Sequence, residues 1–165
     1  MTLVLGIDPA STCGWALVSH PHGLTANRVA SGIFRLARTG DAPGAKFVRL
    51  VDALDDLEER NGRPSVVAYE LPGLFRSSAA ALSVWGIVAH VLAWAERRKI
   101  PTVAVPISTV KRRATGTGKA TGDQTIEWAS RRFRCSPATD DEAEALIVAL
   151  LGLPILRASD PAAVF

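Results

Sequence analysis

The sequence lacks the features that would set it apart from ordinary globular proteins. Its 165 residues include only two cysteines, Cys13 and Cys135, which are too few for a disulfide framework and are not spaced as zinc ligands. No apolar run is long enough to cross a bilayer, and the N-terminus does not place basic residues ahead of an apolar stretch as signal peptides do. We therefore expect a single domain over residues 1–165, located in the cytoplasm and away from membranes.

Acidic residues are scarce in one segment of the chain. Between residues 111 and 134 the only acids are Asp123 and Glu127. The basic residues of this segment are Lys111, Arg112, Arg113, Lys119, Arg131, Arg132 and Arg134. Such a segment can hold a phosphate backbone by charge and counterion release, or it can form a solvated basic surface. Charge alone does not choose between the two interpretations.

The hydropathy pattern predicts a mixed α/β domain without internal repeats. Apolar segments bounded by turn residues predict strands over 3–8, 13–19, 27–36, 65–70 and 101–106. Helical periodicity predicts helices over 45–61, 79–98, 123–133 and 139–151, with a short helix or turn over 107–113. Three antiparallel strands followed by two parallel ones should form a five-stranded sheet with helices on both faces.

Two of the predicted strands end in a carboxylate, Asp8 and Glu70. The ends of parallel strands meet at one edge of a sheet, where sites are usually built. The last helix begins with "TDDEAEAL", in which either Asp140 or Asp141 shares a helix face with Glu144. Acids at a helix start are also favoured by capping alone. If these groups converge, their repulsion predicts Mg²⁺ or Mn²⁺, since hard divalent ions take oxygen ligands.

Four segments carry a resemblance to a known family. "LGIDPAST", "VVAYELP", "VKRRATGTGKA" and "DDEAEALIVAL" resemble, in order and spacing, motifs of the RuvC-like Holliday junction resolvases, over about residues 3–152. The resemblance implies a ribonuclease H-like fold and a homodimer joined through the long helix 79–98. It also implies paired nicking of four-way DNA junctions with two Mg²⁺ or Mn²⁺ ions. By motif match, the metal ligands would be Asp8, Glu70, Asp141 and Glu144.

The resemblance also suggests residues that would contact DNA. Where family members carry a lysine after the "GxG" motif, this chain has Gly122, so Lys119 is the nearest candidate to balance charge on the scissile phosphate and Lys111 is the next. Phe75 would stack on bases at the junction centre, or would simply pack on the core. Further DNA contacts would come from Arg76, Lys111, Arg112, Arg113, Thr115 and Thr117.

Three other functions remain as alternatives. "GIDPAST" also resembles the phosphate loop of the actin, sugar kinase and heat-shock ATPase superfamily, but those proteins need two such lobes around the nucleotide. A protein that binds junctions without cleaving them is a second alternative. A nuclease for flaps, forks or RNA–DNA hybrids is the third, since a basic segment contacts phosphates and does not select a branched shape. The sequence does not identify a helicase partner.

Overall fold

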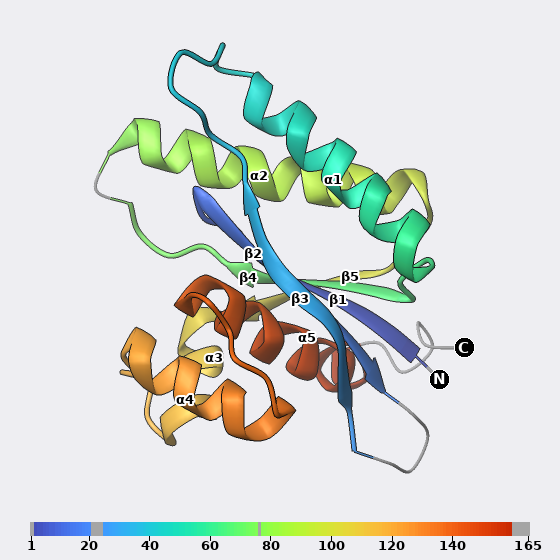
Figure 1. Ribbon diagram of the computed structural model, residues 1–165, viewed down its shortest axis with the longest axis vertical. Coiled ribbons are helices and arrows are strands. Elements are labelled where there is room, and N and C mark those ends of the chain that lie inside the picture. The colour runs from blue at the N-terminus through green and yellow to red at the C-terminus, as the bar shows by residue number, and fades with distance from the viewer. Residues whose placement is uncertain (1, 21–24, 76, 160–165) are drawn as a thin grey trace.

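The chain forms a mixed sheet whose strand order brings β1 to the centre (Figure 1). The computed structural model describes residues 2–20, 25–75 and 77–159, and within these residues the sheet has five strands in the order β3-β2-β1-β4-β5. The strands are β1 (Thr2–Asp8), β2 (Thr12–His20), β3 (Asn27–Arg35), β4 (Val66–Leu71) and β5 (Thr102–Pro106). The first three are antiparallel, and β4 and β5 run parallel to β1. The predicted sheet is confirmed.

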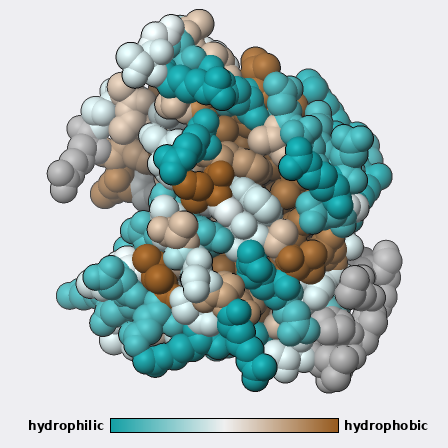
Figure 2. Space-filling model, viewed as in Figure 1, coloured by the Kyte–Doolittle hydropathy of each residue, from teal (hydrophilic) through white to brown (hydrophobic). Residues whose placement is uncertain are grey.

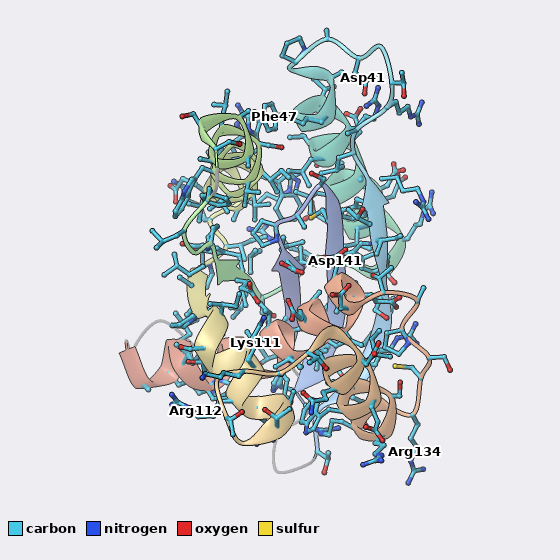
Figure 3. The ribbon with its side chains drawn as sticks, turned by 90° about the vertical axis from the view of Figure 1, so that its left-hand side faces the viewer. Asp41, Phe47, Lys111, Arg112, Arg134 and Asp141 are labelled. Atoms are coloured by element: carbon cyan, nitrogen blue, oxygen red, sulfur yellow. The ribbon has the colours of Figure 1, made fainter. Side chains whose placement is uncertain are left out.

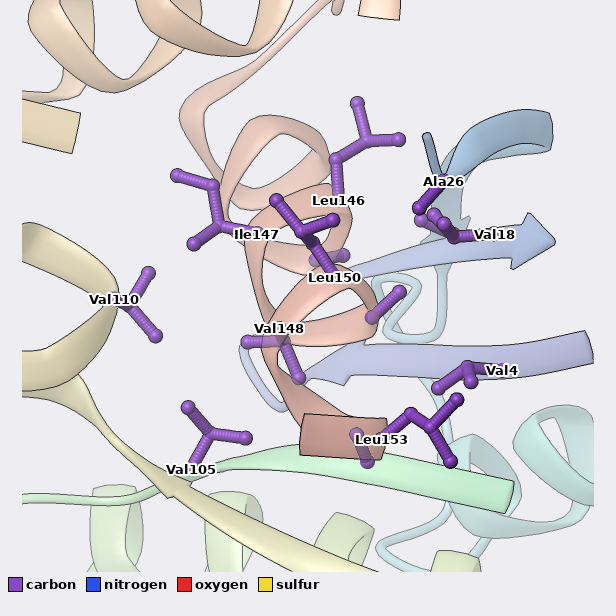
Figure 4. Packing of buried hydrophobic residues seen from close by; sticks show 14 of the residues in the cluster. Val4, Val18, Ala26, Val105, Val110, Leu146, Ile147, Val148, Leu150 and Leu153 are labelled. Atoms are coloured by element: carbon purple, nitrogen blue, oxygen red, sulfur yellow. The ribbon is translucent and has the colours of Figure 1, made fainter. Parts of the chain in front are cut away.

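Helices cover both faces of the sheet, as predicted (Figure 1). The helices are α1 (Ala45–Asn61) and α2 (Ser78–Arg97) on one face and α3 (Ile107–Thr115), α4 (Gly122–Phe133) and α5 (Asp140–Ser159) on the other. Successive side chains of a strand point to opposite faces. Accordingly, Val4 packs in the α5 core shown in Figure 4, whereas Leu5 packs in the core beneath α1 and α2.

Helix α5 lies unusually close to the sheet because glycines face it. A Cβ added to Gly6 would lie 2.3 Å from the Ala145 carbonyl oxygen, and one added to Gly14 would lie 2.0 Å from the Asp141 carbonyl oxygen. These distances leave no room for any side chain at either position. The small residues of β1 and β2 therefore set how near the first turn of α5 comes to the end of β1.

The last helix is longer than the sequence predicts. We expected it to end near residue 151, yet α5 continues to Ser159 with Pro154 inside it. Gly152 lies against Ala68 of β4, and Leu153 and Leu156 are buried. Pro154 removes one hydrogen-bond donor, but packing of the helix on the sheet continues on both sides of it.

Helix α2 contradicts the expectation that no segment could cross a membrane. By length and composition alone it is apolar enough to do so. In the structure its buried residues Ile87, Val91 and Trp94 pack in the core with β1 and α1. Other apolar side chains of α2 are exposed, Leu82 by 73% and Trp85 by 43%.

Candidate active site

Two carboxylates lie side by side where β1 and β4 end. Ile7 pairs with Tyr69 in the parallel register, so Asp8 and Glu70 are the next residues on neighbouring strands. Both side chains are buried, with each residue only 6% exposed. Glu144 reaches them from the first turns of α5, and one ligand atom from each of the three lies within 4.8 Å of the others. The convergence expected from the sequence is therefore present for these three acids.

Burial and mutual repulsion disfavour the charged forms of these groups. The pKa of Asp8 is raised well above its usual value, first by burial and then by Glu70, Glu144 and Asp141. The pKa of Glu70 is raised to about 8 by burial and by Glu144, against an opposing effect of Lys111. The pKa of Glu144 is raised by burial, and Lys111 again opposes the shift. Without a cation, this cluster cannot carry its full negative charge.

The site has the chemistry of a divalent-cation site. One oxygen of Glu70, Oε2, is buried and has no hydrogen-bond partner among the described residues. A buried polar atom without a partner costs free energy, so such an atom usually has an ion or water beside it. Mg²⁺ and Mn²⁺ prefer carboxylate oxygens, and the three converging acids supply them. The residues present thus fit the ion that the sequence predicts.

The structure separates Asp140 from Asp141, which periodicity does not. Asp140 is exposed and its carboxylate lies against Gly122, where an added Cβ would be 2.7 Å from Oδ2. Asp141 is half-buried, and its pKa is raised by burial and by Asp140, whereas an interaction with Asp8 lowers it. Both Asp140 and Asp141 raise the pKa values of Asp8 and Glu144, so the choice of Asp141 as the metal ligand, made from the motif match, stays a prediction. A side chain at position 122 would require the Asp140 carboxylate to turn aside.

Lys111 is the lysine whose charge acts on the acids. It lies on α3 and favours the charged forms of both Glu70 and Glu144. Lys119 is exposed in the loop that follows α3, and within residues 2–20, 25–75 and 77–159 no interaction joins it to the acids. The assignment of Lys119 to the site stays a prediction.

The start of α5 is held by a residue that the sequence analysis missed. Glu142 is buried and accepts hydrogen bonds from the Ser31 hydroxyl at 2.6 Å and the Ala138 backbone N–H at 2.8 Å. The Thr139 hydroxyl accepts from the Glu142 N–H at 3.2 Å. The spacing Thr-x-x-Glu is the signature of a capping box and could have predicted the Thr139 contact, but not the bonds from Ser31 and the Ala138 N–H. These bonds tie the turn that carries Asp141 to β3.

The residues proposed to contact DNA come from two segments of the sequence, the stretch after β4 and the stretch from α3 onward. Phe75 is half-buried in the loop after β4, and Leu74, which the sequence analysis did not select, is fully exposed. Arg76 lies outside the described residues. The molecular surface is hollowed between this loop and α3–α4, at the left of Figure 2. Figure 3 shows Lys111 and Arg112 below Asp141 on the α3 side.

The remaining residues of the predicted interface lie on or after α3. Arg112 and Arg113 are exposed, and the Arg113 guanidinium lies 5.4 Å from the ring centroid of Trp128. The hydroxyls of Thr115 and Thr117 lie 3.2 Å apart in the turn after the helix. These groups present charge and hydrogen-bonding capacity on α3 and in the turn after it.

Comparison with known families identifies the class of protein. The family model described as "Crossover junction endodeoxyribonuclease RuvC" matches residues 4–151. The chain belongs to the RuvC family. A RuvC from Anaeromyxobacter dehalogenans (strain 2CP-C) is 34% identical over 163 residues, which are 98% of this chain and 85% of the relative. One from Prochlorococcus marinus is 29% identical over 92% of this chain and 97% of the relative.

Solved structures share the fold of this RuvC family member. A Thermus thermophilus RuvC in complex with a Holliday junction substrate matches with a TM-score of 0.82, 23% identity, and coverage of 96% of this chain and 97% of that one. The yeast mitochondrial Holliday junction resolvase Ydc2 matches with a TM-score of 0.64, 15% identity, and coverage of 90% and 76%. The resemblance to the family and the ribonuclease H-like fold are therefore confirmed.

Proposed function

We propose that this RuvC family member is a metal-dependent endonuclease that resolves four-way DNA junctions by paired nicks. The observation that carries the proposal is the buried cluster of Asp8, Glu70 and Glu144 with an unpartnered oxygen on Glu70. Such a cluster suits hydrolysis of a phosphodiester, because the substrate and the acids are all anionic and need a shared cation. A RuvC bound to a Holliday junction has the same fold.

Asp8, Glu70, Asp141 and Glu144 would hold the ions, which we infer to be two Mg²⁺ or Mn²⁺. When bound, two such ions activate a water nucleophile and stabilise the leaving oxygen in phosphoryl transfer. The ends of β1 and β4 fix Asp8 and Glu70, and the capping contacts of Glu142 fix the turn that carries Asp141. The chain's own contribution is therefore a set of carboxylate oxygens held in place by the sheet and by α5, with Asp8 and Glu70 buried and Asp141 and Glu144 half-buried.

Lys111 would stabilise the negative charge of the scissile phosphate from the side of the cluster that faces α3. Lys119, which the family resemblance suggests for this role, is the alternative. The exposed residues Arg112 and Arg113, with Arg76, Thr115 and Thr117, would contact neighbouring phosphates. Phe75 would stack on bases where the junction opens, next to the exposed Leu74.

Paired nicks need two active sites, so we infer a homodimer. The exposed side chains of Leu82 and Trp85 lie three residues apart and share one face of α2. A second copy of the chain would cover these apolar side chains. We place the protein in the cytoplasm, where its DNA substrate is accessible.

A panel of labelled DNA substrates tests the proposal. The four-way junction, a replication fork, a flap and a linear duplex are each incubated with the protein and Mg²⁺ or Mn²⁺, and the products are resolved on denaturing gels. We expect symmetric nicks in the four-way junction and little cleavage of the duplex. Binding without cleavage in either metal would contradict the nuclease assignment, and preferential cleavage of the fork or flap would contradict the substrate assignment.

A further inference from the structure

A second charged site lies away from the acids, where the end of α4 meets the start of β3. A cavity of about 440 Å³ opens there. Three of its lining residues are arginines contributed by two segments that are distant in sequence. The lining residues are Thr25, Asn27, Arg28, Arg132, Phe133 and Arg134. We call this the arginine pocket. Figure 3 shows Arg134 near the end of α4, on the opposite side from Lys111 and Arg112.

The pocket is held in shape by contacts that leave its charges available. Arg132 donates to the Ala26 carbonyl at 2.9 Å, which ties α4 to the segment before β3. Arg28 donates from Nε to the Ser31 hydroxyl at 2.7 Å, and Ser31 donates in turn to Glu142. Both oxygens of Glu142 are thus already engaged, by Ser31 and by the Ala138 N–H. Among the described residues, Arg28 donates only from Nε, and it lines the cavity.

No described carboxylate forms an ion pair with Arg28, Arg132 or Arg134, the arginines of the pocket. Arg132 is half-buried, and its pKa is lowered by burial and by Arg113. Arginine remains charged under all ordinary conditions, so the repulsion persists until an anion binds. Figure 2 shows hydrophilic residues gathered over this part of the molecule, at its lower edge.

The spacing between the pocket and the acids suits a duplex arm. Arg28 pairs with Val18, and Val18 pairs with Val4, four residues before Asp8. Two strands sideways and four residues along the sheet correspond to about 16 Å between the α-carbons of Arg28 and Asp8. This line runs within the protein, where α5 packs on β1, β2 and β3, so the path of DNA over the surface is longer than about 16 Å, or about five base-pair steps of about 3.4 Å. A duplex arm that leaves the acids in the direction of β3 would bring its backbone over the pocket.

We propose that the arginine pocket binds phosphates in the backbone of a DNA arm that extends past β3. The inference rests on the proposed function, because it takes DNA as the ligand of the protein. An extended polyanion matches the site better than a single small anion, since the three guanidinium groups come from two segments and line an open cavity. The pocket would position the arm and would take no part in the chemistry.

The test measures how binding of a four-way junction depends on salt. All variants carry Asp8→Asn, so that the DNA stays intact, and dissociation constants are measured by fluorescence anisotropy over a series of NaCl concentrations. Each lost phosphate contact lowers the slope of log K against log salt by about 0.9. We expect this loss for Arg134→Gln and about twice this loss for Arg28→Gln with Arg134→Gln. Arg134→Lys keeps the charge and should restore the slope.

The control is Arg63→Gln, which removes the same charge from an exposed residue after α1, on the other face of the sheet. Its slope should equal that of the Asp8→Asn background. If the background protein itself does not bind the junction, the proposed function fails independently of the pocket. If the background binds and Arg134→Gln keeps the full slope, the pocket does not hold DNA and the inference is overturned. Thermal unfolding of each variant establishes that it is folded.

Discussion

Like charges gather at two places in this molecule, and the two places differ in how far water reaches them. Asp8 and Glu70 are buried, whereas Arg28 and Arg134 of the arginine pocket are exposed. Burial raises the free energy of the charged acids, so they require a compact cation at short distance. Exposed arginines keep their charge in water and attract an extended anion over a longer range. One site is thus suited to chemistry and the other to positioning.

The largest expected effect is the loss of cleavage when one acid of the buried site is removed. Asp8→Asn keeps the shape of the side chain but removes its charge, and metal-ion stabilisation of the reaction is worth several kcal/mol. We expect junction cleavage to fall by about 10³-fold or more, whereas the affinity for the junction should change by less than about twofold. Gel assays of nicking and fluorescence anisotropy measure the two quantities.

The matched control for this change is Asp52→Asn, which removes the same charge from an exposed residue of α1. It should leave both cleavage and binding unchanged. An Asp8→Asn protein that cleaves at the normal rate would mean that the acid cluster is not the active site.

Variants of Lys111 and Lys119 compare a cation that acts on the buried acids with a cation in a solvated loop. Lys111 favours the charged forms of Glu70 and Glu144, and Lys119 is exposed. We expect Lys111→Gln to lower the cleavage rate by about 10²-fold, a typical loss for one group that stabilises a transition state. Lys119→Gln should have a much smaller effect. A larger loss for Lys119→Gln would restore the assignment made from the family resemblance.

Gly6→Ala tests whether the approach of α5 to the sheet sets the acid site. An added Cβ would lie 2.3 Å and 2.5 Å from backbone atoms of Ala145 and Ala149, which cannot rotate away. Overpacking of this kind costs about 2 kcal/mol, or about 6 °C in Tm for a chain of this size. Because α5 carries Glu144, cleavage should also fall, whereas the salt dependence of binding should not.

Thermal unfolding and the nicking assay measure these effects of Gly6→Ala. Gly44→Ala is the control, since a Cβ at Gly44 would meet nothing within 4 Å. Equal Tm values for Gly6→Ala and the unchanged protein would show that the helix can move without cost.

Apolar runs and turn residues were sufficient to predict most of the fold and the two acids of the site that end strands, Asp8 and Glu70. The strands that end at Asp8 and Glu70 follow from apolar runs bounded by turn residues, and their adjacency follows from the parallel arrangement. Periodicity could not choose between Asp140 and Asp141, because both lie within reach of Glu144 on a helix. Their surroundings differ only through tertiary contacts, such as that of Asp140 with Gly122, and the choice of ligand stays a prediction.

The arginine pocket could not be predicted from the sequence, because it also depends on tertiary contacts. Arg132 and Arg134 stood out within a basic segment, but nothing local relates them to Arg28 at the start of β3. The final helix was predicted too short, since Pro154 usually marks an end and the packing of Leu153 and Leu156 on the sheet overrides it. Long-range packing decided each of these cases.

The smallest expected effect concerns His20. This partly buried side chain lies near enough to Arg132 and Arg157 for their charges to lower its pKa. The pKa of His20 is lowered, first by burial and then by Arg157 of α5 and Arg132 of α4, against a hydrogen bond with the Ala149 carbonyl. A histidine with a lowered pKa binds fewer protons in the folded state than in the unfolded state, where its pKa is about 6.5. Its contribution to stability is therefore complete above about pH 6.5 and is lost as the pH falls through the folded-state pKa.

His20→Gln removes the titration and keeps a group that can donate to Ala149. We expect Tm to fall less between about pH 7.5 and 5.5 in the variant than in the unchanged protein, because one source of preferential protonation in the unfolded state is gone. Thermal unfolding at constant ionic strength measures the difference between the two slopes. Identical slopes would mean that neither burial nor the charges of Arg132 and Arg157 lower the pKa of this half-buried side chain. The arginines would then act on an anion only by direct contact, whereas the buried acids act on one another without water between them.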